Sequence, residues 1–180
     1  MSDYILETPR LGMRRFCEAD IPHLRAFLQR DAVMFAYGGA FDEEKVQQWY
    51  RRQLDRYDTY GDFGSWALCL KESGIFIGQC GLTICQVRGA DHMEVGYILD
   101  QPFWGHGYAT EGAIACKEFA FRQLSRSHVV SRIRCDNMPS INVAIRNGMT
   151  AWDCVPDNMG SGLYNLVFGI ENPNNQKEGR

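Results

Sequence analysis

Apolar residues alternate with polar or small ones from Asp91 to Leu99, where Met93, Val95 and Tyr97 hold apolar positions. A period of two predicts a strand whose two faces have different surroundings. Other short apolar segments bounded by turn residues also favour strands. We therefore predict about seven strands, at residues 10–16, 65–70, 75–87, 91–99, 129–135, 151–155 and 163–170.

Apolar residues spaced three or four positions apart predict about four helices. The first begins at Asp20, and the others cover residues 42–58, 110–124 and 137–148. Asp42 is a suitable N-cap for the second helix because its side chain can accept a hydrogen bond from the first turn.

Tyrosines gather around the end of this second helix and in the loop that precedes it. Tyr37 lies in the loop of residues 34–40, and Tyr57 and Tyr60 lie at the end of the helix. Two interpretations remain open at this point, because such side chains either line a substrate cleft or simply pack against the core.

The order of these elements predicts the fold. Short turns containing glycine join the strands between residues 65 and 99, which indicates an antiparallel meander. A helix separates strand 91–99 from strand 129–135, which favours a parallel, right-handed crossover. We expect an α/β (α+β) fold with a mixed, mostly antiparallel sheet, in one domain over residues 1–170, followed by a disordered polar tail over 171–180.

Composition excludes several classes of protein. The net charge of −3 gives no basic field, so nucleic acid is not an expected partner. No apolar run approaches the roughly 20 residues of a membrane span, and the first residues do not resemble a secretory signal. We therefore expect a cytoplasmic protein without a membrane partner. Its seven cysteines are scattered and lack C-x-x-C spacing, so we predict neither a metal site nor disulfides.

A glycine-rich turn follows strand 91–99. Gly105, Gly107 and Ala109 stand at alternate positions, just before a predicted helix. Small residues allow backbone N–H groups to approach a ligand, and the first turn of a helix has unpaired N–H groups and a partial positive charge. A pyrophosphate would fit there, although an ordinary tight turn is the alternative. The residues of a P-loop and of a dinucleotide-binding motif are missing.

Three separated motifs resemble one family. Residues 104–109 read W-G-H-G-Y-A and are preceded by E-V-G-Y at 94–97. E-T-P-R-L-G-M-R-R stands near the N-terminus, and N-x-x-S-x-x-V-x-x-R-x-G-M covers 137–149. Together they resemble the GNAT superfamily of N-acyltransferases, and within it the RimJ/RimL branch, which acetylates the N-termini of ribosomal proteins. Trp104 replaces the Gln or Arg that is usual in the superfamily.

The resemblance implies an enzyme that transfers an acetyl group from acetyl-CoA directly to a primary amine, with no metal. For the acceptor we expect a protein or peptide α-amine. Two alternatives remain: a small amine such as a polyamine, amino acid or antibiotic as acceptor, and a non-catalytic acyl-CoA-binding module. An exposed sheet edge also leaves a homodimer open.

The same resemblance implies residues that hold the cofactor. The pantetheine arm would pair with backbone groups of Ile98 and Leu99, much as an added strand does. Asn137 would contact the pantetheine or fix the strand end. Arg146 would either reach the adenosine phosphates or remain a solvated surface residue. The pyrophosphate would be held by the turn and helix start at Gly105, His106, Gly107, Tyr108, Ala109 and Thr110.

Catalytic roles are implied for two side chains. Glu94 matches the glutamate that acts as a base in the family, but it could also be a strand residue paired with an arginine. A backbone N–H near Leu99 would stabilise the thioester oxygen. Many members use a tyrosine as the acid, and Ala144 occupies that position here. Ser140 is the alternative acid, unless it only begins a helix and a water supplies the proton.

Overall fold

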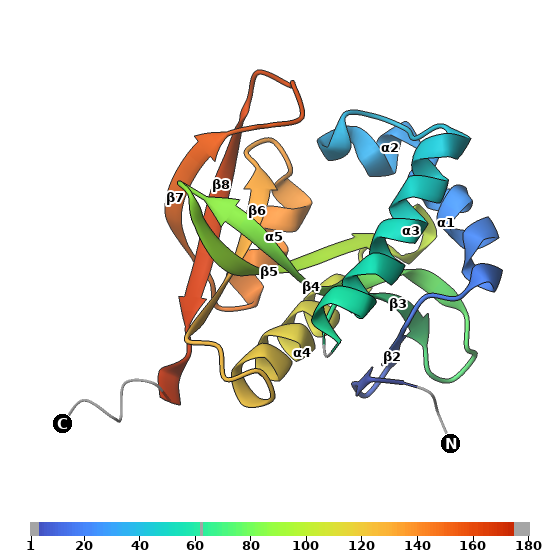
Figure 1. Cartoon of the computed structure of the whole chain (residues 1–180), viewed down its shortest axis with the longest axis horizontal. Coiled ribbons are helices and arrows are strands. Elements are labelled where there is room, and N and C mark those ends of the chain that lie inside the picture. Colours follow the sequence, from blue (N-terminus) through green and yellow to red (C-terminus); the bar gives the residue numbers. More distant parts are fainter. Residues whose placement is uncertain (1–3, 62, 175–180) are drawn as a thin grey trace.

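The computed structural model describes residues 4–61 and 63–174, and an eight-stranded sheet runs through them (Figure 1). The strand order is β1-β2-β3-β4-β5-β6-β8-β7, and each neighbouring pair is antiparallel except β5–β6. The predicted mixed, mostly antiparallel sheet with one parallel pair is confirmed. The strands are β1 Leu6–Glu7, β2 Leu11–Arg14, β3 Ser65–Leu70, β4 Phe76–Val87, β5 Ala90–Leu99, β6 His128–Arg134, β7 Thr150–Pro156 and β8 Tyr164–Glu171.

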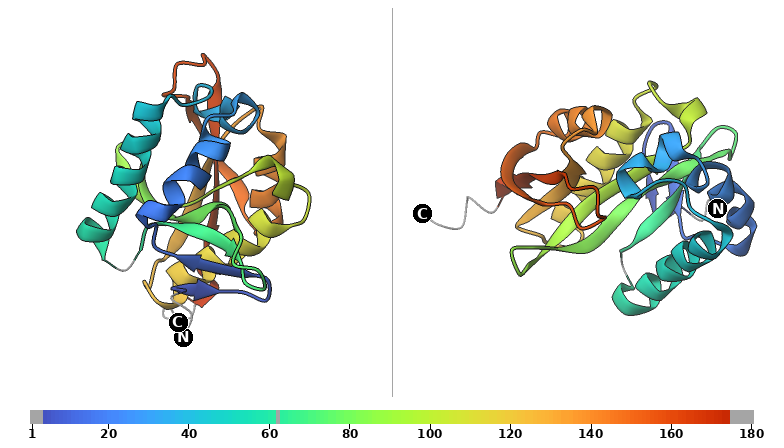
Figure 2. Two further views of the ribbon diagram at one scale, coloured as in Figure 1. Left: turned by 90° about the vertical axis from the view of Figure 1, so that its right-hand side faces the viewer. Right: turned by 90° about the horizontal axis from the view of Figure 1, so that it is seen from above.

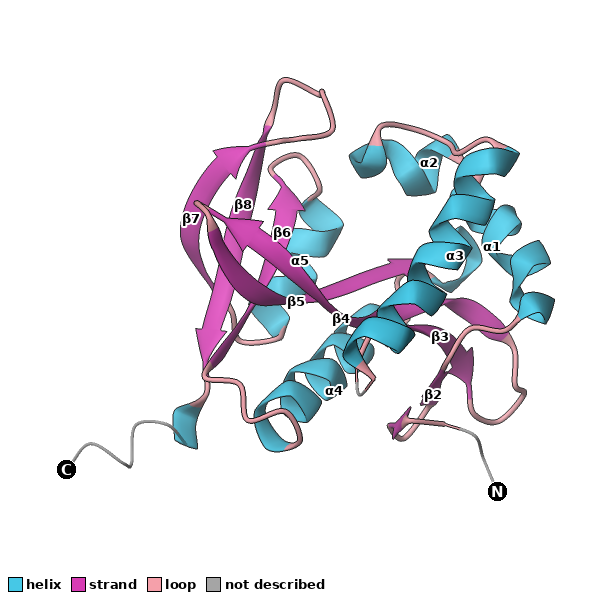
Figure 3. Cartoon of the chain, viewed as in Figure 1, coloured by secondary structure: helices cyan, strands magenta, loops and turns pink. Residues whose placement is uncertain are grey.

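The helices cover both faces of this sheet (Figures 2 and 3). On one face, Tyr57 of α3 donates a hydrogen bond to the carbonyl of Ser65 in β3. On the other face, Cys116 of α4 lies 3.6 Å from Cys80 of β4. The four predicted helices are present, and a short additional helix, α2, lies just before and at the start of the predicted 34–40 loop. The α-helices are α1 Ile21–Leu28, α2 Asp31–Met34, α3 Glu43–Tyr60, α4 Tyr108–Arg122 and α5 Met138–Arg146.

The hydrophobic core joins these layers. It includes Phe27 of α1, Val46 of α3, Trp66 of β3 and Cys116 of α4, each of which is at most 1% exposed. Burial of such apolar side chains supplies most of the favourable free energy of folding. Over the described residues, every helix is too short or too polar to cross a membrane.

Within the described residues, the ladder between β5 and β6 has only one bridged pair of residues. The β4–β5 ladder pairs ten residues on each strand, whereas the only pair between β5 and β6 is Glu94 with Val130. Beyond Glu94 the two strands separate, while β5 stays paired with β4 as far as its end at Leu99 (Figure 1). This separation leaves one edge of β5 without a neighbouring strand, and it is the feature of the fold that positions the site.

The C-terminal boundary differs from the prediction of a disordered tail over 171–180. Strand β8 extends to Glu171, and Asn172 is buried. The backbone N–H of Asn172 donates to Ser127 O at 2.7 Å, and its side-chain amide donates to Arg126 O at 3.2 Å. Residues 171–174 therefore belong to the folded chain because these bonds tie them to the turn before β6. The rest of the predicted tail, 175–180, lies outside the described residues.

Candidate active site

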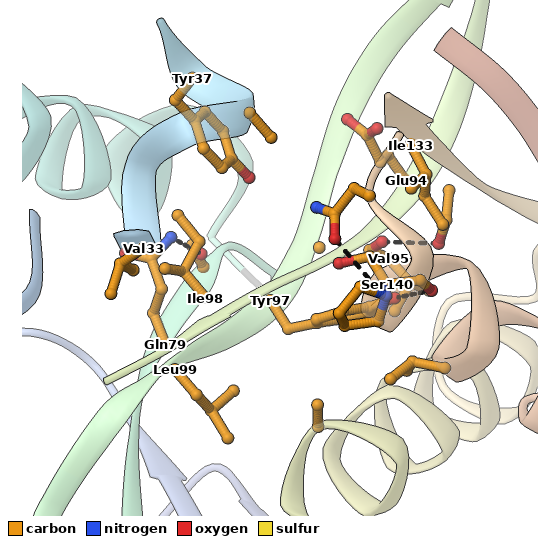
Figure 4. Close-up of a pocket in the computed structure, with 18 of the residues that line it drawn as sticks. Val33, Tyr37, Gln79, Glu94, Val95, Tyr97, Ile98, Leu99, Ile133 and Ser140 are labelled. Carbon is orange, nitrogen blue, oxygen red and sulfur yellow. Dashed lines mark hydrogen bonds between the residues drawn. The ribbon is translucent and has the colours of Figure 1, made fainter. Parts of the chain in front are cut away.

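A large cleft opens where β5 and β6 separate. Its volume is about 1600 Å³, and its walls come from β5, β6, α3, the glycine-rich turn and the start of α5. Tyr37 and Ser140 approach β5 from opposite sides of it (Figure 4). Of the predicted site residues, all but His106 line this cleft: Glu94, Ile98, Leu99, Gly105, Gly107, Tyr108, Ala109, Thr110, Asn137, Ser140 and Arg146.

His106 does not line the cleft. Its ring stacks on Tyr108, with ring centroids 5.6 Å apart, and its Nδ1 lies 2.8 Å from Trp104 O. The side chain is exposed and does not take part in the cleft lining. Any contribution of His106 to the site is therefore made by its backbone.

The glycine-rich turn has the backbone geometry of an anion site. Gly105 and Gly107 have φ angles of 79° and 80°, a region in which other residues are strained. A side chain at Gly105 would meet open space, so the backbone there is accessible to a ligand. Within α4, Glu111 N–H donates to Gly107 O at 3.0 Å. The N–H groups before Glu111 begin the helix without a helical acceptor and are available to an anion.

The N-terminal segment holds this turn in place. Thr8 Oγ1 donates to Glu111 at 2.6 Å, and Arg10 donates to the same carboxylate through its backbone N–H at 3.0 Å and Nε at 2.7 Å. Arg10 also donates to His106 O at 3.0 Å and lies over the Tyr108 ring. The E-T-P-R-L motif was visible in the sequence, but its role was not, because its partner is about a hundred residues away.

These contacts keep Glu111 ionised. Burial raises the pKa of Glu111, but the hydrogen bonds from Thr8 and Arg10 outweigh it, and the pKa lies below its usual value of 4.5. The carboxylate is therefore a fixed acceptor at neutral pH that ties the N-terminal segment to the first turn of α4.

The strand register decides which backbone groups of β5 face the cleft. Asp100 N–H donates to Ile77 O of β4, and Ile98 is paired with Gln79 of the same strand. Because the direction of backbone hydrogen bonds alternates along a strand, Ile98 also points its N–H and C=O toward β4. Tyr97 and Leu99 point theirs toward the cleft. We predicted that backbone groups of Ile98 pair with the pantetheine arm, and the register assigns this pairing to Tyr97 instead. The prediction for the backbone N–H of Leu99 is retained.

Trp104 closes the turn onto the strand. Its indole N–H donates to Leu99 O at 2.8 Å, which joins the end of β5 to the residue that begins the W-G-H-G-Y-A motif. This tryptophan is the departure from the usual Gln or Arg. It leaves Leu99 N–H, but not Leu99 O, free for a ligand.

Glu94 is paired with an arginine of the next strand. Its Oε1 accepts from the backbone N–H of Arg132 at 3.1 Å and from Arg132 Nε at 3.2 Å, and its Oε2 accepts from Arg132 Nη2 at 3.2 Å. Burial lowers the pKa of Arg132, but the hydrogen bonds with Glu94 outweigh it and the pKa is raised. The interpretation of Glu94 as a strand residue paired with an arginine is confirmed. The carboxylate also lines the cleft and Oε2 keeps acceptor capacity, so its role as a base stays a prediction.

An aromatic wall faces Glu94 across the cleft. Tyr37 meets Trp49 of α3 edge to face at 5.9 Å, and Trp49 Nε1 donates to Gln79 Oε1 at 2.8 Å. Burial, and next the nearby charge of Glu94, raise the pKa of Tyr37 to about 12, so this phenol stays protonated. Tyr37 is thus a cleft residue. Tyr57 is buried, and neither it nor Tyr60 lines the cleft, so the packing interpretation holds for these two.

The start of α5 presents a serine to the cleft. Asn137 caps this helix by accepting from Ser140 N–H at 3.3 Å, and its own backbone N–H donates to Arg134 O at the end of β6 at 2.8 Å. The Ser140 hydroxyl forms no hydrogen bond with any residue in 4–61 or 63–174, and its carbonyl accepts from Tyr97 Oη at 2.9 Å. Ala144 is buried, so the position that holds a tyrosine in many family members lies inside the core here.

Metal ligands are not gathered anywhere in the described part of the chain. Over 4–61 and 63–174, no three His, Cys, Asp or Glu residues stand close enough together to hold a metal ion. All seven cysteines are free thiols. The cleft is lined instead by the backbone of the glycine-rich turn, the Glu94–Arg132 pair, hydroxyl and aromatic side chains, and further charged side chains.

Comparison with known proteins agrees with this geometry. A family model described as an acetyltransferase (GNAT) domain matches residues 10–150. The uncharacterized protein YkkB of Bacillus subtilis is 32% identical over 145 residues, which cover 80% of this chain and 84% of that protein. An acetyltransferase structure from Agrobacterium tumefaciens is similar with a TM-score of 0.80 at 29% identity, over 93% of this chain and 94% of the other.

A second solved structure shares the fold at lower identity. RimL, a ribosomal-protein alpha-N-protein acetyltransferase in complex with coenzyme A, is similar with a TM-score of 0.75 at 18% identity, over 93% of this chain and 97% of that one. At this identity the likeness concerns the fold. The residues matched by the family model include the glycine-rich turn, Glu94 and Ser140.

Proposed function

This chain belongs to the GNAT acetyltransferase family and is an N-acetyltransferase, and we propose that it transfers the acetyl group of acetyl-CoA directly to the α-amine of a protein or peptide. One observation carries the proposal. The anion-binding turn, the free edge of β5 and the Glu94 carboxylate all line the same cleft. A cofactor that combines a pyrophosphate, an amide-containing arm and a reactive thioester needs these three features in that order.

The residues present fit acetyl-CoA. The N–H groups of the turn and of the first turn of α4 would hold the pyrophosphate, because charge-assisted hydrogen bonds contribute about 1.5–3 kcal/mol each. Tyr97 and Leu99 would pair with the amides of the pantetheine arm. Arg146 lines the cleft at the end of α5, without an ion pair to any described residue, and would meet the adenosine phosphates.

The chemistry follows from the two cleft walls. The amine nitrogen attacks the thioester carbon, a cleft-facing backbone N–H of β5 stabilises the oxygen, and the C–S bond breaks. Glu94 takes the proton of the attacking amine, directly or through a water bound at Oε2. The departing thiolate receives a proton from the Ser140 hydroxyl or from a water. Tyr37 stays protonated and is therefore a hydrogen-bond donor to the acceptor side of the cleft.

Two features support a chain terminus as the acceptor. The N-x-x-S motif at residues 137–140 is that of the RimJ/RimL branch, and RimL is named as an alpha-N-protein acetyltransferase. The cleft is also open and large enough for several residues of an extended peptide. The alternative acceptor, a small amine, uses the same cofactor site and differs only on the side of Tyr37 and α3.

The proposal is tested by comparing acceptors under one set of conditions. Purified protein and acetyl-CoA are incubated with peptides that have free N-termini, and in parallel with a polyamine, free amino acids and an aminoglycoside. We expect kcat/KM for the best peptide to exceed that of every small amine by more than about tenfold, since a peptide fills more of the cleft. A small amine that equals or exceeds the best peptide contradicts the proposed acceptor.

The link between Glu111 and the N-terminal segment predicts a selective effect on the cofactor. Glu111→Gln removes the charge that holds Arg10 and should raise KM for acetyl-CoA by about 3- to 10-fold, with kcat changed by less than about twofold. The pKa of Glu111 is lowered, so its contribution is complete at neutral pH and is lost only as the pH falls below the usual value of 4.5. The KM ratio between variant and parent should therefore be constant from about pH 6 upward.

A glutamate on the same helix provides the control. Glu118→Gln removes an exposed carboxylate that is paired with Lys117 and Arg122 and does not line the cleft. We expect this variant to keep the KM of the parent. Equal effects of the two substitutions would mean that Glu111 has no particular role in holding the turn.

A further inference from the structure

Three basic residues of α3 line the cleft on the side away from the glycine-rich turn. One face of the helix carries Lys45, Trp49, Arg52 and Arg56, which stand at positions i, i+4, i+7 and i+11. The Arg52 guanidinium lies 5.8 Å from the centroid of the Trp49 ring, and Arg56 Nη1 donates to Gln53 Oε1 at 2.9 Å. Both guanidinium groups are thus held in position by neighbours on their own helix.

These three cations have no acidic partner in the part of the chain that the structure describes. The arginines of β6 differ, since Arg132 is paired with Glu94 and Arg134 with Asp136. Burial and next the charge of Arg52 lower the pKa of Arg56. Arg56 is half-buried, whereas Lys45 and Arg52 are exposed. The acceptor side of the cleft therefore has three cations that form no ion pair within the described residues, and such a group attracts an anion.

The floor beneath these arginines is open. Trp49 bonds to Gln79, which pairs with Ile98, and Tyr57 bonds to Ser65, which pairs through Gly81 with Gly96. Arg52 and Arg56 line the same cleft as Gly96, and Arg56 lies near enough to Glu94 for the charge of that carboxylate to act on its pKa. A side chain at Gly96 would meet no atom within 4 Å. The open space lies between Ile98 and Glu94 on one face of β5.

We infer that Arg52 and Arg56 form a binding site for carboxylates of the acceptor, and that the preferred acceptor is a peptide with acidic residues close to its N-terminus. The space over Gly96 would hold the first residues, with the α-amine at Glu94 and the acidic side chains at the arginines. Arg52, Arg56 and Lys45 would select the acceptor by charge, whereas the pyrophosphate would be held beyond Leu99, at the glycine-rich turn. This inference deepens the proposed function and rests on it.

The test compares matched peptides with the parent and with single variants. Three peptides of the same length begin with serine and alanine and continue with two glutamates, two glutamines or two lysines. At about 0.1 M salt we expect the parent to prefer the glutamate peptide over the glutamine peptide by roughly tenfold in kcat/KM, and over the lysine peptide by more. Arg56→Gln or Arg52→Gln should reduce the first preference to less than about threefold.

Two further variants separate charge from structure. Arg51→Gln removes the neighbouring exposed arginine, which does not line the cleft, and should keep the full preference. Arg56→Lys keeps the positive charge, and this variant should keep most of the preference for the glutamate peptide. Coenzyme A affinity, measured by calorimetry, should be unchanged in all these variants because the cofactor site lies elsewhere.

The outcomes separate this inference from the proposed function. Equal kcat/KM for the three peptides, or a preference that survives in both Arg52→Gln and Arg56→Gln, overturns the carboxylate site while acetylation of peptides still supports the proposed function. Absence of acetylation of every peptide, with coenzyme A binding intact, overturns the proposed function and this inference with it.

Discussion

Replacing Glu94 with glutamine is expected to lower kcat by about 10²-fold or more, with little change in the affinity for coenzyme A. The substitution keeps the size of the side chain and removes only the charge that accepts a proton from the amine. A peptide α-amine with a pKa of about 7.7–8.0 is mostly protonated at neutral pH, so the loss should be largest there and smaller at alkaline pH. Initial rates measured across the pH range, with saturating acetyl-CoA, would check this prediction.

The ion pair with Arg132 makes a second variant necessary. Glu94→Gln also removes the ion pair with Arg132 and the bond accepted at Oε2, so a loss of activity could reflect altered strand packing. Arg132→Gln breaks the same pair and leaves the carboxylate. We expect Arg132→Gln to keep at least about tenfold more activity than Glu94→Gln. If the two variants lose equal activity, Glu94 acts only as a structural partner of Arg132.

Replacing Gly107 with glutamate is expected to weaken coenzyme A binding by about 10²-fold, which corresponds to about 2.7 kcal/mol. Gly107 has a φ of 80° at the N-terminus of α4, so any side chain strains the turn. A carboxylate at this position would also repel the pyrophosphate and occupy the path to the first N–H groups. Isothermal titration calorimetry with coenzyme A measures the effect.

Backbone strain alone is controlled at another glycine. Gly89 has a φ of 83°, lies in the turn between β4 and β5, and has no atom within 4 Å of the position of an added side chain. Gly89→Glu should lower thermal stability about as much as Gly107→Glu and leave coenzyme A affinity unchanged. If Gly107→Glu binds coenzyme A with the affinity of the parent, the glycine-rich turn does not hold the pyrophosphate.

The sequence allowed most of the elements to be predicted because their patterns are local. The alternation in 91–99, the capping residue Asp42 and the glycines of the turn all act within a few residues. The glycine-rich turn alone predicted an anion site, and only the family resemblance implied that the anion is the pyrophosphate of acetyl-CoA. Strand β1 and helix α2 were missed because two-residue and four-residue elements are too short to produce a period.

Side-chain partners distant in sequence could not be predicted. The pair of Glu94 with Arg132 depends on the one bridged position between β5 and β6, and that of Arg10 with Glu111 joins residues about a hundred positions apart. An arginine partner for Glu94 was considered, but nothing in the pattern identified which arginine.

The assignment of Ile98 shows a related limit. Alternation along a strand indicates which side chains share a face, but it does not indicate which neighbour receives the backbone bonds. That information came from the pairing of Ile98 with Gln79 on β4. The backbone contacts of β5 can therefore be assigned only when the register between β4 and β5 is known.

The position of the acetyl group on a single product distinguishes acetylation of an α-amine from acetylation of a lysine. A peptide with a free N-terminus and one internal lysine is incubated with acetyl-CoA and the purified protein, and the product is sequenced by tandem mass spectrometry. We predict one acetyl group on the α-nitrogen and none on the lysine. An acetyl group on the lysine alone, or no acetyl group although coenzyme A binds, would contradict the proposal that this protein acetylates the α-amine of a peptide.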